Sequence, residues 1–397
     1  MSNEQQLQDL RARIDELDGQ LLQMITTRAE LAKAVAGAKG GEANDYYRPE
    51  REAQVLRKII SRNRGPLSDE EMARLFREIM SACLALQQPL NVGFLGPEGT
   101  FTHAAVQKHF GRSVQALPMG TIDDVFREVE AEACHYGVVP VENSIEGVVN
   151  HTLDMFINSP LRICGEVELR IHHHLLGKAA NPDGLMRVYG HEQALAQCRR
   201  WLTSVLPDAV VVPALSTAEA ASTLADGTGS HDAAVAAPIA AERYRLEVLA
   251  TDIEDNPDAV TRFVLVGRPG QPPMPSGHDK TTLVAFISDD HAGALLEVLT
   301  EFAVRGVNLT RIESRPTGEG MGRYCFSLDC EGHVDDARVG EALTGLRRVC
   351  ADVRFLGSYP RHDNGPAAEE SSRVAKERDS VYRDAAAWLG RIRNGKL

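Results

Sequence analysis

The stretch Asp258-Ala259-Val260-Thr261-Arg262-Phe263 leads into the apolar run Val264-Leu265-Val266, and a linker rich in proline and glycine follows. A polar turn that enters an apolar run predicts a β-strand. A hydroxyl and a guanidinium at the entrance of such a strand are typical of the edge of a binding site, because sites gather at strand ends. Taken alone, the stretch has a second interpretation, in which Thr261 is an ordinary strand former and Arg262 a solvated edge residue.

The composition is that of a globular chain. Of its 397 residues, 43% are hydrophobic and 25% charged, and this length favours about two to four domains. No apolar run approaches the ~20 residues that span a bilayer. The N-terminus lacks the order of a signal peptide, so we expect a cytoplasmic protein. A formal net charge of -13 argues against general nucleic-acid binding.

The cysteines and histidines indicate no metal site. The seven cysteines contain no C-x-x-C pair, which favours reduced, mostly buried thiols. The run His172-His173-His174 resembles a metal site, but on a strand the middle ring points away from its neighbours. No further ligand cluster lies near the run in sequence, so we expect neither a metal nor a cofactor.

An apolar seam at spacings of three and four predicts a long amphipathic helix near the N-terminus. Arg28 occupies a position where the pattern asks for an apolar residue. Arg28 either lays its alkyl stem along the seam or pairs with a carboxylate on a facing helix, or it belongs to a cationic pocket for an anion. The seam consists of Leu10, Ile14, Leu17, Leu21, Met24, Leu31, Val35 and Ala38.

Helix geometry predicts which cations can share a ligand with Arg28. Lys39 lies within about 20° of Arg28 and about 16 Å further along the helix, so two long side chains can converge on one small molecule. Arg11 lies about 25 Å in the other direction and about 100° round the helix. Arg11 can therefore reach the same ligand only from a second copy of the chain, which predicts an intertwined homodimer.

Two further helices are expected, one from Pro49 to about Gly65 and one from the capping box at Ser68 to Gln88, with Cys83 and Gln87 on one face. With these helices, the chain resembles the small all-helical chorismate mutases over about its first ninety residues. The residues that carry this resemblance are Leu10-Arg11, Arg28, Ala38-Lys39, Arg51-Glu52 and Gln87.

The resemblance implies a site for the chorismate dianion in which Arg11, Arg28 and Arg51 hold carboxylates or the hydroxyl. It places Lys39 and Gln87 at the ether oxygen of chorismate and Glu52 at the ring hydroxyl. Arg48 and Cys83 stand where some members carry Asp and Ser, and both are expected contacts. The rearrangement needs no covalent help from the protein, so cations and hydrogen-bond donors suffice.

After Gln88-Pro89 the pattern changes to alternating strands and helices, and four expected strands end in small polar residues. Each motif alone is more often a helix cap or a turn, but together they predict two α/β lobes around a small anion. No G-x-G-x-x-G nucleotide loop is present. The motifs are Gly96-Pro97-Glu98-Gly99-Thr100, Pro140-Val141-Glu142-Asn143-Ser144, Gly190-His191 and Leu215-Ser216-Thr217.

The stretches 96–103, 140–144 and 216–221, together with Thr261-Arg262-Phe263, resemble prephenate dehydratase over residues 91–268. Gly190 stands where some members carry a serine. The resemblance implies a periplasmic-binding-protein-like pair of lobes, with Thr261 near the hydroxyl that leaves prephenate. A threonine hydroxyl is too weak an acid to protonate freely, so we assign it hydrogen-bond donation and leave proton transfer open. The expected prephenate contacts are Thr100, Asn143, Ser144, Ser216, Thr217, Thr261, Arg262 and Phe263.

Beyond a linker at residues 269–280, the pattern predicts the βαββαβ order of a ferredoxin-like domain. Gly293-Ala294-Leu295 and Glu313-Ser314-Arg315-Pro316 resemble the ACT regulatory domain, in which phenylalanine binds between paired domains. The alternative is a dimerisation module that binds nothing. The expected effector contacts are Gly293, Ala294, Leu295, Asn308, Leu309, Glu313, Ser314 and Arg315.

The combination resembles the bifunctional chorismate mutase/prephenate dehydratases, the bacterial P-proteins. We expect an all-α domain at 1–90, a two-lobed α/β domain at 91–268 and an α+β domain at 281–360. Residues 361–373 read as a flexible tail, followed by a weak helical stripe. One alternative is a ligand-sensing protein with inactive catalytic sites. Another is a mutase fused to a prephenate dehydrogenase, which would need the missing nucleotide loop.

Overall fold

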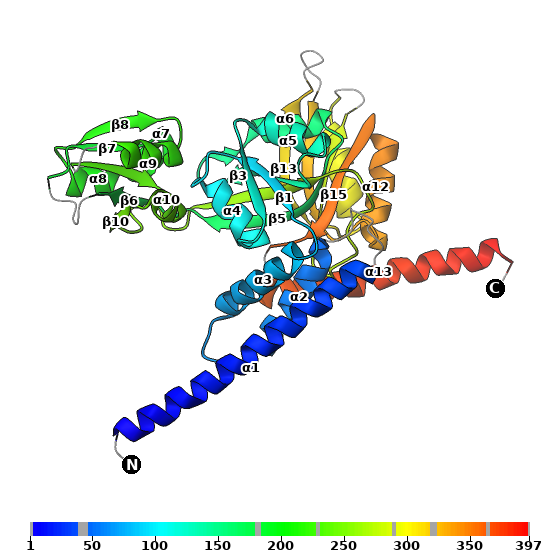
Figure 1. Ribbon diagram of the computed structural model, residues 1–397. Coiled ribbons are helices and arrows are strands. Elements are labelled where there is room, and N and C mark those ends of the chain that lie inside the picture. The colour runs from blue at the N-terminus through cyan, green and yellow to red at the C-terminus, as the bar shows by residue number, and fades with distance from the viewer. Residues whose placement is uncertain are drawn as a thin grey trace.

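The computed structural model describes residues 3–38, 47–178, 184–227, 231–287, 291–317, 324–362 and 366–395. Along the chain, a helical unit is followed by two α/β lobes and then by an α+β unit (Figure 1). This order agrees with the fold class expected from the sequence. In the described part of the chain, no helix has a stretch that is long and apolar enough to cross a membrane.

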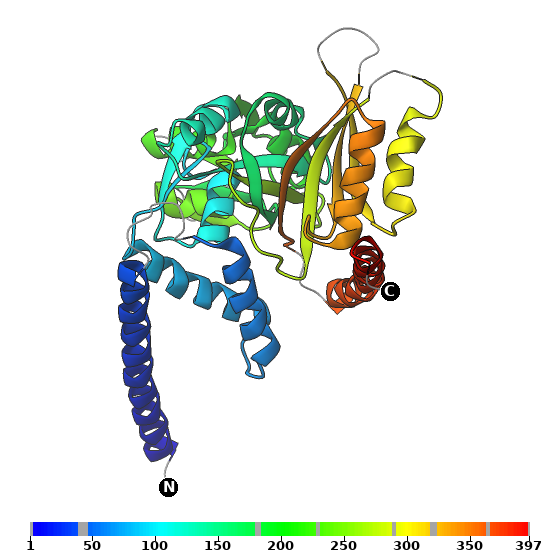
Figure 2. The same ribbon diagram turned by 90° about the vertical axis from the view of Figure 1, so that its right-hand side faces the viewer.

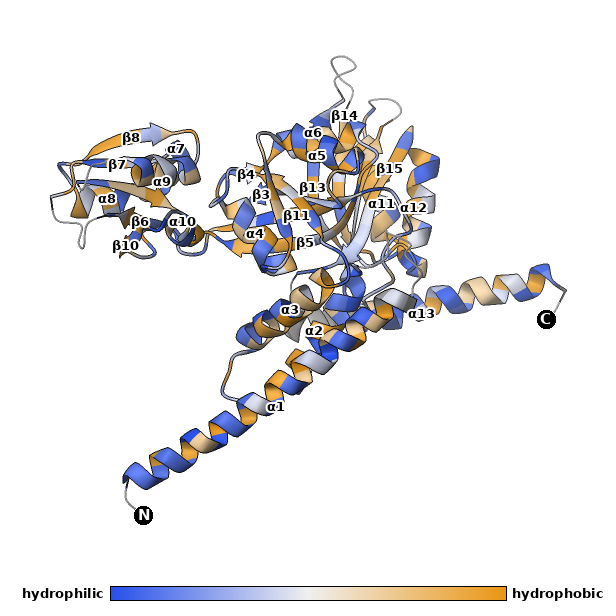
Figure 3. Cartoon of the chain, viewed as in Figure 1, coloured by the Kyte–Doolittle hydropathy of each residue, from blue (hydrophilic) through white to orange (hydrophobic). Residues whose placement is uncertain are grey.

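The helical unit consists of α1 (Asn3–Ala38), α2 (Pro49–Arg62) and α3 (Asp69–Ala85). Pro49 starts α2, where its missing N–H costs nothing, and Ser68 caps α3 by accepting the backbone N–H of Glu71 at 3.2 Å. The long helix α1 projects away from the rest of the molecule (Figures 1 and 2). Its apolar seam lies open: Leu10 is 49% exposed and Leu17 56% (Figure 3).

The first α/β lobe is built on a six-stranded sheet with the order β2-β1-β3-β11-β5, in which β4 pairs with β3. Its strands are β1 (Asn91–Leu95), β2 (Gln115–Met119), β3 (Tyr136–Asn143), β4 (Gly147–Val148), β5 (Arg162–Arg170) and β11 (Val260–Gly267). Its helices are α4 (Phe101–Phe110), α5 (Ile122–Glu130) and α6 (Asn150–Asn158).

The second lobe has a five-stranded sheet of its own, with the order β10-β6-β9-β7-β8. The chain enters this lobe after β5 and returns to the first sheet with β11, so two crossings join the lobes. The strands are β6 (His174–Gly177), β7 (Arg187–His191), β8 (Val210–Ala214), β9 (Asp232–Ala236) and β10 (Glu247–Ala250). The helices are α7 (Glu192–Gln197), α8 (Arg199–Val205), α9 (Thr217–Asp226) and α10 (Pro238–Tyr244).

The α+β unit has the βαββαβ order expected from the sequence, with an antiparallel sheet ordered β13-β14-β12-β15. Helices α11 and α12 cover one face of this sheet (Figure 2). From the other face, Val284, Leu356 and Tyr359 join the core of the first lobe. The elements are β12 (Asp279–Phe286), α11 (Ala294–Ala303), β13 (Leu309–Pro316), β14 (Tyr324–Glu331), α12 (Ala337–Val349) and β15 (Asp352–Pro360).

The edge strand β15 lies directly against β5, the edge strand of the first lobe. A Cβ built on Gly357 would lie 2.0 Å from the carbonyl oxygen of Ile163, so only glycine fits there. The α+β unit is therefore packed permanently against the first lobe rather than tethered to it.

The C-terminal segment forms one helix, α13 (Pro366–Arg393), and the prediction of a flexible tail up to residue 373 was wrong. Proline suits the first turn of a helix, which explains why the helix begins so early. The buried carboxylate of Asp379 accepts the backbone N–H of Arg338 at the start of α12 at 3.0 Å, which holds α13 against the α+β unit.

Candidate active and regulatory sites

The start of β11 meets the ends of β1 and β3 at one edge of the first sheet. Strands β1 and β3 are parallel, and β11 runs antiparallel to β3 with Thr261 opposite Asn143. Nδ2 of Asn143 donates to Oγ1 of Thr261 at 2.8 Å, and Thr261 is 8% exposed. Within the described contacts, the hydroxyl of Thr261 only accepts, so its own hydrogen is free to donate to a substrate oxygen.

The turn after β3 fixes the amide of Asn143. Its Oδ1 accepts the backbone N–H groups of Ile145 at 2.9 Å and Glu146 at 3.1 Å, which leaves Nδ2 aimed at Thr261. Oγ of Ser144 accepts the backbone N–H of Val260 at 3.0 Å, tying the same turn to the start of β11. Asn143 and Ser144 are thus brought to Thr261, as the sequence predicted.

Thr100 caps α4 after β1, at the same edge of the sheet. Its Oγ1 accepts the backbone N–H of His103 at 3.3 Å. His103 was missed by sequence reasoning: it is 7% exposed, and its Nδ1 accepts the N–H of Gly99 at 3.1 Å. Burial lowers the pKa of His103, so the ring stays neutral beside the turn.

The second lobe touches this turn. A Cβ on Gly99 would lie 3.5 Å from the Cβ of Ala218 in α9, and the Tyr244 hydroxyl donates to the carbonyl of Glu98 at 2.8 Å. Ser216 caps α9, and its Oγ accepts the N–H of Glu219 at 2.9 Å. The starts of α4 and α9, with Thr100 on one lobe and Ser216-Thr217 on the other, therefore face the junction between the lobes.

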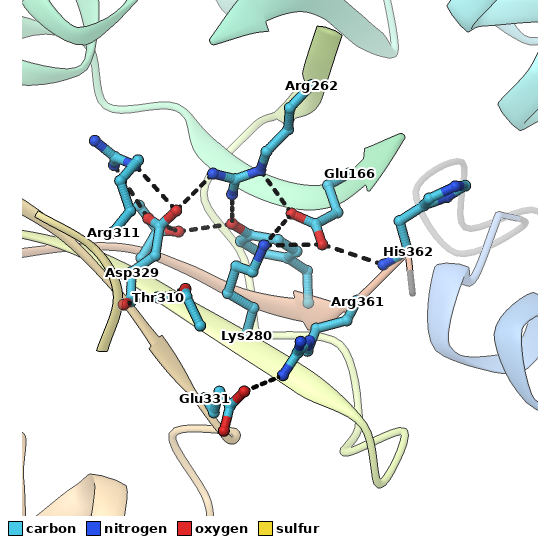
Figure 4. A network of polar contacts seen from close by, with 11 residues as sticks. Glu166, Arg262, Lys280, Thr310, Arg311, Asp329, Glu331, Arg361 and His362 are labelled. Atoms are coloured by element: carbon cyan, nitrogen blue, oxygen red, sulfur yellow. Dashed lines mark hydrogen bonds and ion pairs between the residues drawn. The ribbon is translucent and has the colours of Figure 1, made fainter. Parts of the chain in front are cut away.

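Arg262 and Phe263 do not join Thr261, contrary to the sequence-based expectation. Arg262 follows Thr261 on β11 and points to the opposite face, where Nε donates to Oε2 of Glu166 at 2.8 Å and Nη1 to Oδ2 of Asp329 at 2.6 Å (Figure 4). Phe263 is 2% exposed and packs in the core with Phe94. Alternation along the strand turns Arg262 away from Thr261, and the register with β3 shifts between Arg262 and Phe263.

Of the expected chorismate ligands, Arg11 and Arg28 do not meet within the described part of one chain. Nη1 of Arg28 lies 3.5 Å from the carbonyl of Ile79 and therefore faces α3, whereas Arg11, Arg48 and Arg51 are exposed. Arg11 and Arg28 are separated by about 25 Å along α1. Lys39 lies outside the described residues.

Helix α3 ends earlier than expected, which changes the position of Gln87. Cys83 is buried in the last turn, but α3 stops at Ala85, and the N–H of Gln87 bonds the carbonyl of Leu84 at 2.8 Å. Pro89 disfavours helical backbone in the residue before it, which explains the early end. Cys83 and Gln87 therefore do not share a helical face.

Glu52 of α2 faces a cation that the sequence did not reveal. Nε of Arg77 on α3 lies 3.3 Å from Oε1 of Glu52. Burial raises the pKa of Glu52, and Arg77 offsets only part of that shift. Nearby, the hydroxyl of Tyr47 lies 2.5 Å from Nε2 of His109 on α4, and burial lowers the pKa of His109 to about 3. The contact of Tyr47 with His109 ties the helical unit to the first lobe.

A hollow of about 260 Å³ opens at the start of α11 in the α+β unit. Gly293, Ala294, Leu295 and Ser314 line it, as expected from the sequence, and so do Ile287, His291, Tyr324 and Phe326, which sequence reasoning missed. Gly293 has φ +101°, a left-handed backbone that only glycine adopts freely. The remaining expected contacts, Asn308, Leu309, Glu313 and Arg315, do not line the hollow.

The chain matches the models of three protein families in the order of these units. They are Chorismate mutase type II at residues 10–88, Prephenate dehydratase at 92–271 and ACT domain at 282–348. The chain is 50% identical over 367 residues to the bifunctional chorismate mutase/prephenate dehydratase of Pseudomonas aeruginosa, covering 91% of this chain and 99% of that protein. The chain belongs to the bifunctional chorismate mutase/prephenate dehydratase family.

Other members and neighbours agree with this assignment. The bifunctional chorismate mutase/prephenate dehydratase of Neisseria gonorrhoeae is 44% identical, covering 88% of this chain and 96% of that protein. The solved structure of prephenate dehydratase from Arthrobacter aurescens in complex with L-Phe has a TM-score of 0.68 and 41% identity, covering 77% of this chain and all of that one. This chain is therefore an enzyme with chorismate mutase and prephenate dehydratase activities.

The histidine run of the dehydratase lies between the lobes. His173 turns toward Gln197, with Nε2 3.0 Å from Oε1, while Nδ1 of His172 lies 2.8 Å from Oε1 of Glu254. His172, Asp252 and Glu254 are the one group of described side chains with metal-ligand spacing, their ligand atoms lying within 4.8 Å of one another. Glu254 is also bonded to the N–H of His173 at 2.8 Å, which gives it a structural role.

Proposed function

We propose that this enzyme makes phenylpyruvate for phenylalanine biosynthesis, by rearranging chorismate and then dehydrating and decarboxylating prephenate, and that L-phenylalanine inhibits it. The single observation that carries the proposal is the hydrogen bond from Asn143, at the end of β3, to Thr261, at the start of β11. The proposed domains are residues 1–90, 91–268 and 281–360, with a linker at 269–280 and an extension at 361–397.

In the dehydratase, prephenate loses carbon dioxide and its ring hydroxyl together. The electron pair of the breaking carbon–carboxylate bond enters the ring, which becomes aromatic as the carbon–oxygen bond breaks. Charge develops on the departing oxygen, so a preorganised donor lowers the barrier. Thr261 supplies that hydrogen bond, and Asn143 holds its oxygen in place. The helix starts at Thr100 and Ser216-Thr217, with Ser144, suit the substrate carboxylates, since free N–H groups there favour anions.

In the mutase, a second copy of the chain covers the seam of α1. Leu10, Leu17 and Leu21 are each about half exposed, which a lone helix in water does not tolerate well. Two antiparallel copies of α1 bring Arg11 of one chain toward Arg28 of the other, so that cations from both hold the chorismate carboxylates. Glu52, Arg51, Arg48, Lys39, Cys83 and Gln87 remain proposed contacts on this basis.

In the ACT domain, L-phenylalanine occupies the hollow at Gly293. The exposed N–H groups at the start of α11 suit its carboxylate, and Ile287 and Phe326 offer apolar surface for its ring. Leu296, 66% exposed, lies in the first turn of α11 near the hollow, where a second ACT domain would cover it. The solved Arthrobacter dehydratase is itself a complex with L-Phe.

The test is to incubate the purified chain with chorismate and no cofactor, and to follow prephenate and phenylpyruvate separately. The parent should form phenylpyruvate, whereas Thr261→Val should stop at prephenate. Thr203→Val, which removes an exposed threonine hydroxyl on α8, is the matched control and should behave as the parent. A chain that binds prephenate without converting it would be a sensor with inactive sites, and the proposal would fail.

A further inference from the structure

Strand β11 carries two adjacent residues with different surroundings. Thr261 meets Asn143 within the first lobe, at 2.8 Å. Arg262 is 8% exposed and reaches into the ACT domain, where Nη1 bonds Oδ2 of Asp329 at 2.6 Å and Nη2 bonds the hydroxyl of Tyr359 at 2.9 Å. Because Thr261 and Arg262 are adjacent on β11, a shift of the Arg262 backbone is passed directly to Thr261.

The ACT domain holds the Arg262 side chain through a buried network (Figure 4). Asp329 is fully buried and also accepts hydrogen bonds from Arg311, at 3.1 Å, and from the hydroxyl of Thr282, at 2.9 Å. Burial on its own would raise the pKa of Asp329, but Arg262 and Arg311 hold it below its usual range, so the carboxylate stays charged. Since an unpaired buried charge costs free energy, Asp329, Arg262 and Arg311 must move together.

On the lobe side, Glu166 of β5 completes the network. Its Oε2 accepts from Nε of Arg262 at 2.8 Å and from Nζ of Lys280 at 2.8 Å. Its Oε1 accepts the backbone N–H of His362 at 3.1 Å. Lys280 lies on β12 of the ACT sheet and His362 follows β15, so Arg262 is fixed between carboxylates of both domains.

Strand β13 connects the same network to the effector hollow. Arg311 and Ser314 both lie on β13, Arg311 bonded to Asp329 and Ser314 lining the hollow. Along β13, half-buried and exposed positions alternate, so the strand presents one face to the interface and the other to the hollow side. A displacement of β13 on filling the hollow therefore acts directly on the partner of Arg262.

We propose that Arg262 is a positioning residue through which the ACT domain sets the Thr261–Asn143 geometry, with Asp329 and Tyr359 as the points where the domain holds it. The path runs from the hollow along β13 to Arg311, across Asp329 to Arg262, and one residue along β11 to Thr261. This inference rests on the proposed role of Thr261 and on the proposed effector hollow.

The test uses the full chain with Asp329→Asn, which removes the charge but keeps the shape, and Tyr359→Phe, which removes only the hydroxyl. The control is Asp154→Asn, since Asp154 on α6 pairs with Arg315 of the same ACT domain at 2.7 Å but does not touch β11. For each variant, kcat and KM for prephenate are measured with and without L-phenylalanine, together with mutase activity and L-phenylalanine binding by calorimetry.

Asp329→Asn and Tyr359→Phe should each lower dehydratase kcat about threefold to tenfold and leave mutase activity and L-phenylalanine binding unchanged. The ratio of prephenate KM with and without L-phenylalanine should fall by about fivefold. In a Thr261→Val background, Tyr359→Phe should change kcat by less than about twofold, because the group that it positions is gone. Asp154→Asn should match the parent in every measurement.

Equal effects of Asp154→Asn and Asp329→Asn would overturn the inference, because they would show only a general interface effect. Parental kcat and parental L-phenylalanine response in Tyr359→Phe would overturn it too, and this variant decides if Asp329→Asn fails to fold. Full additivity with Thr261→Val would mean that Arg262 acts elsewhere. A parent that turns prephenate over but ignores L-phenylalanine would refute the proposed regulation alone, and the kcat measurements would still decide the positioning role.

Discussion

Thr261 and Arg262 are neighbours on β11, yet the hydroxyl of Thr261 lies 2.8 Å from Nδ2 of Asn143 in the first lobe and the guanidinium of Arg262 lies 2.6 Å from Oδ2 of Asp329 in the ACT domain. The sequence motif Thr261-Arg262 suggests a single site, but its two side chains contact two different domains. The catalytic proposal depends on the hydroxyl alone, and it can be tested without disturbing the interface.

Replacing Thr261 by Ser keeps the hydroxyl, and we expect substantial dehydratase activity to remain. Thr261→Val keeps the shape but removes the donor, and should cost roughly 2.7 to 4 kcal/mol of barrier, a fall in kcat of about 10² to 10³. Both variants should rearrange chorismate at the parental rate. The measurement is steady-state kinetics on supplied prephenate. If Thr261→Val had a kcat close to that of the parent, Thr261 would have only a structural role.

Removing the cation of α1 should separate the two activities. Arg28→Ala should lower mutase kcat at least about 100-fold, because a carboxylate of chorismate loses its partner, while dehydratase activity on prephenate stays near normal. Comparable loss of both activities in a folded variant would contradict two independent sites.

A shared mutase site can be tested by complementation. Arg11→Ala and Arg28→Ala chains, each inactive as a mutase, are unfolded, mixed and refolded together. Hybrid dimers should contain one site with both arginines intact and recover part of the activity. If hybrids form, as shown by tagged subunits, and no activity returns, each site lies within one chain.

The conformation of Gly293 predicts an effect on effector binding. Gly293→Val puts a branched side chain at φ +101°, where it strains the backbone and crowds the N–H groups of α11, so L-phenylalanine should bind more weakly. Gly184→Val, at φ +77° in the second lobe with open space around it, imposes similar strain away from the hollow. Calorimetry should show weaker binding for the first variant and parental binding for the second.

The half-buried imidazole of His109 predicts a loss of stability in acid. The folded chain keeps His109 neutral down to about pH 3, whereas the unfolded chain takes up a proton below about pH 6.5. Stability is therefore lost as the pH falls between these values, by roughly 2 to 3 kcal/mol at pH 4.5. In urea melts, His109→Gln should flatten this dependence, while His231→Gln, at an exposed site, should leave it unchanged.

Removing the ACT domain should destabilise the dehydratase. A chain that ends at Arg268 leaves Arg262 without Asp329 and leaves Glu166 without Lys280. We expect it to lose at least about 3 kcal/mol of unfolding free energy. A chain that ends at His362 keeps the network and should be affected less. Equal stability of the first chain and the parent would show that the interface contributes little.

The sequence revealed the residues that share a chemical motif, but not the partners that come from far along the chain. Asn143 and Thr261 could be assigned to one site in advance, because each lies at the end or entrance of an expected strand and both belong to the motifs that resemble prephenate dehydratase. Asp329 and Tyr359 lie in ordinary strand sequence, 67 and 97 residues beyond Arg262, so no local signal links them to it. Likewise, the sequence pattern predicts that Arg77 is exposed to solvent, and only the packing of α2 on α3 brings it to Glu52.

Gly357 limits how the regulatory domain can act. With the backbone of Ile163 so close that no Cβ fits between β5 and β15, any opening of this joint must part closely packed backbone. A signal between the domains must then travel as a strain of small amplitude through a joint that stays assembled. Such a joint favours fast, graded control of turnover over slow switching between docked and undocked forms.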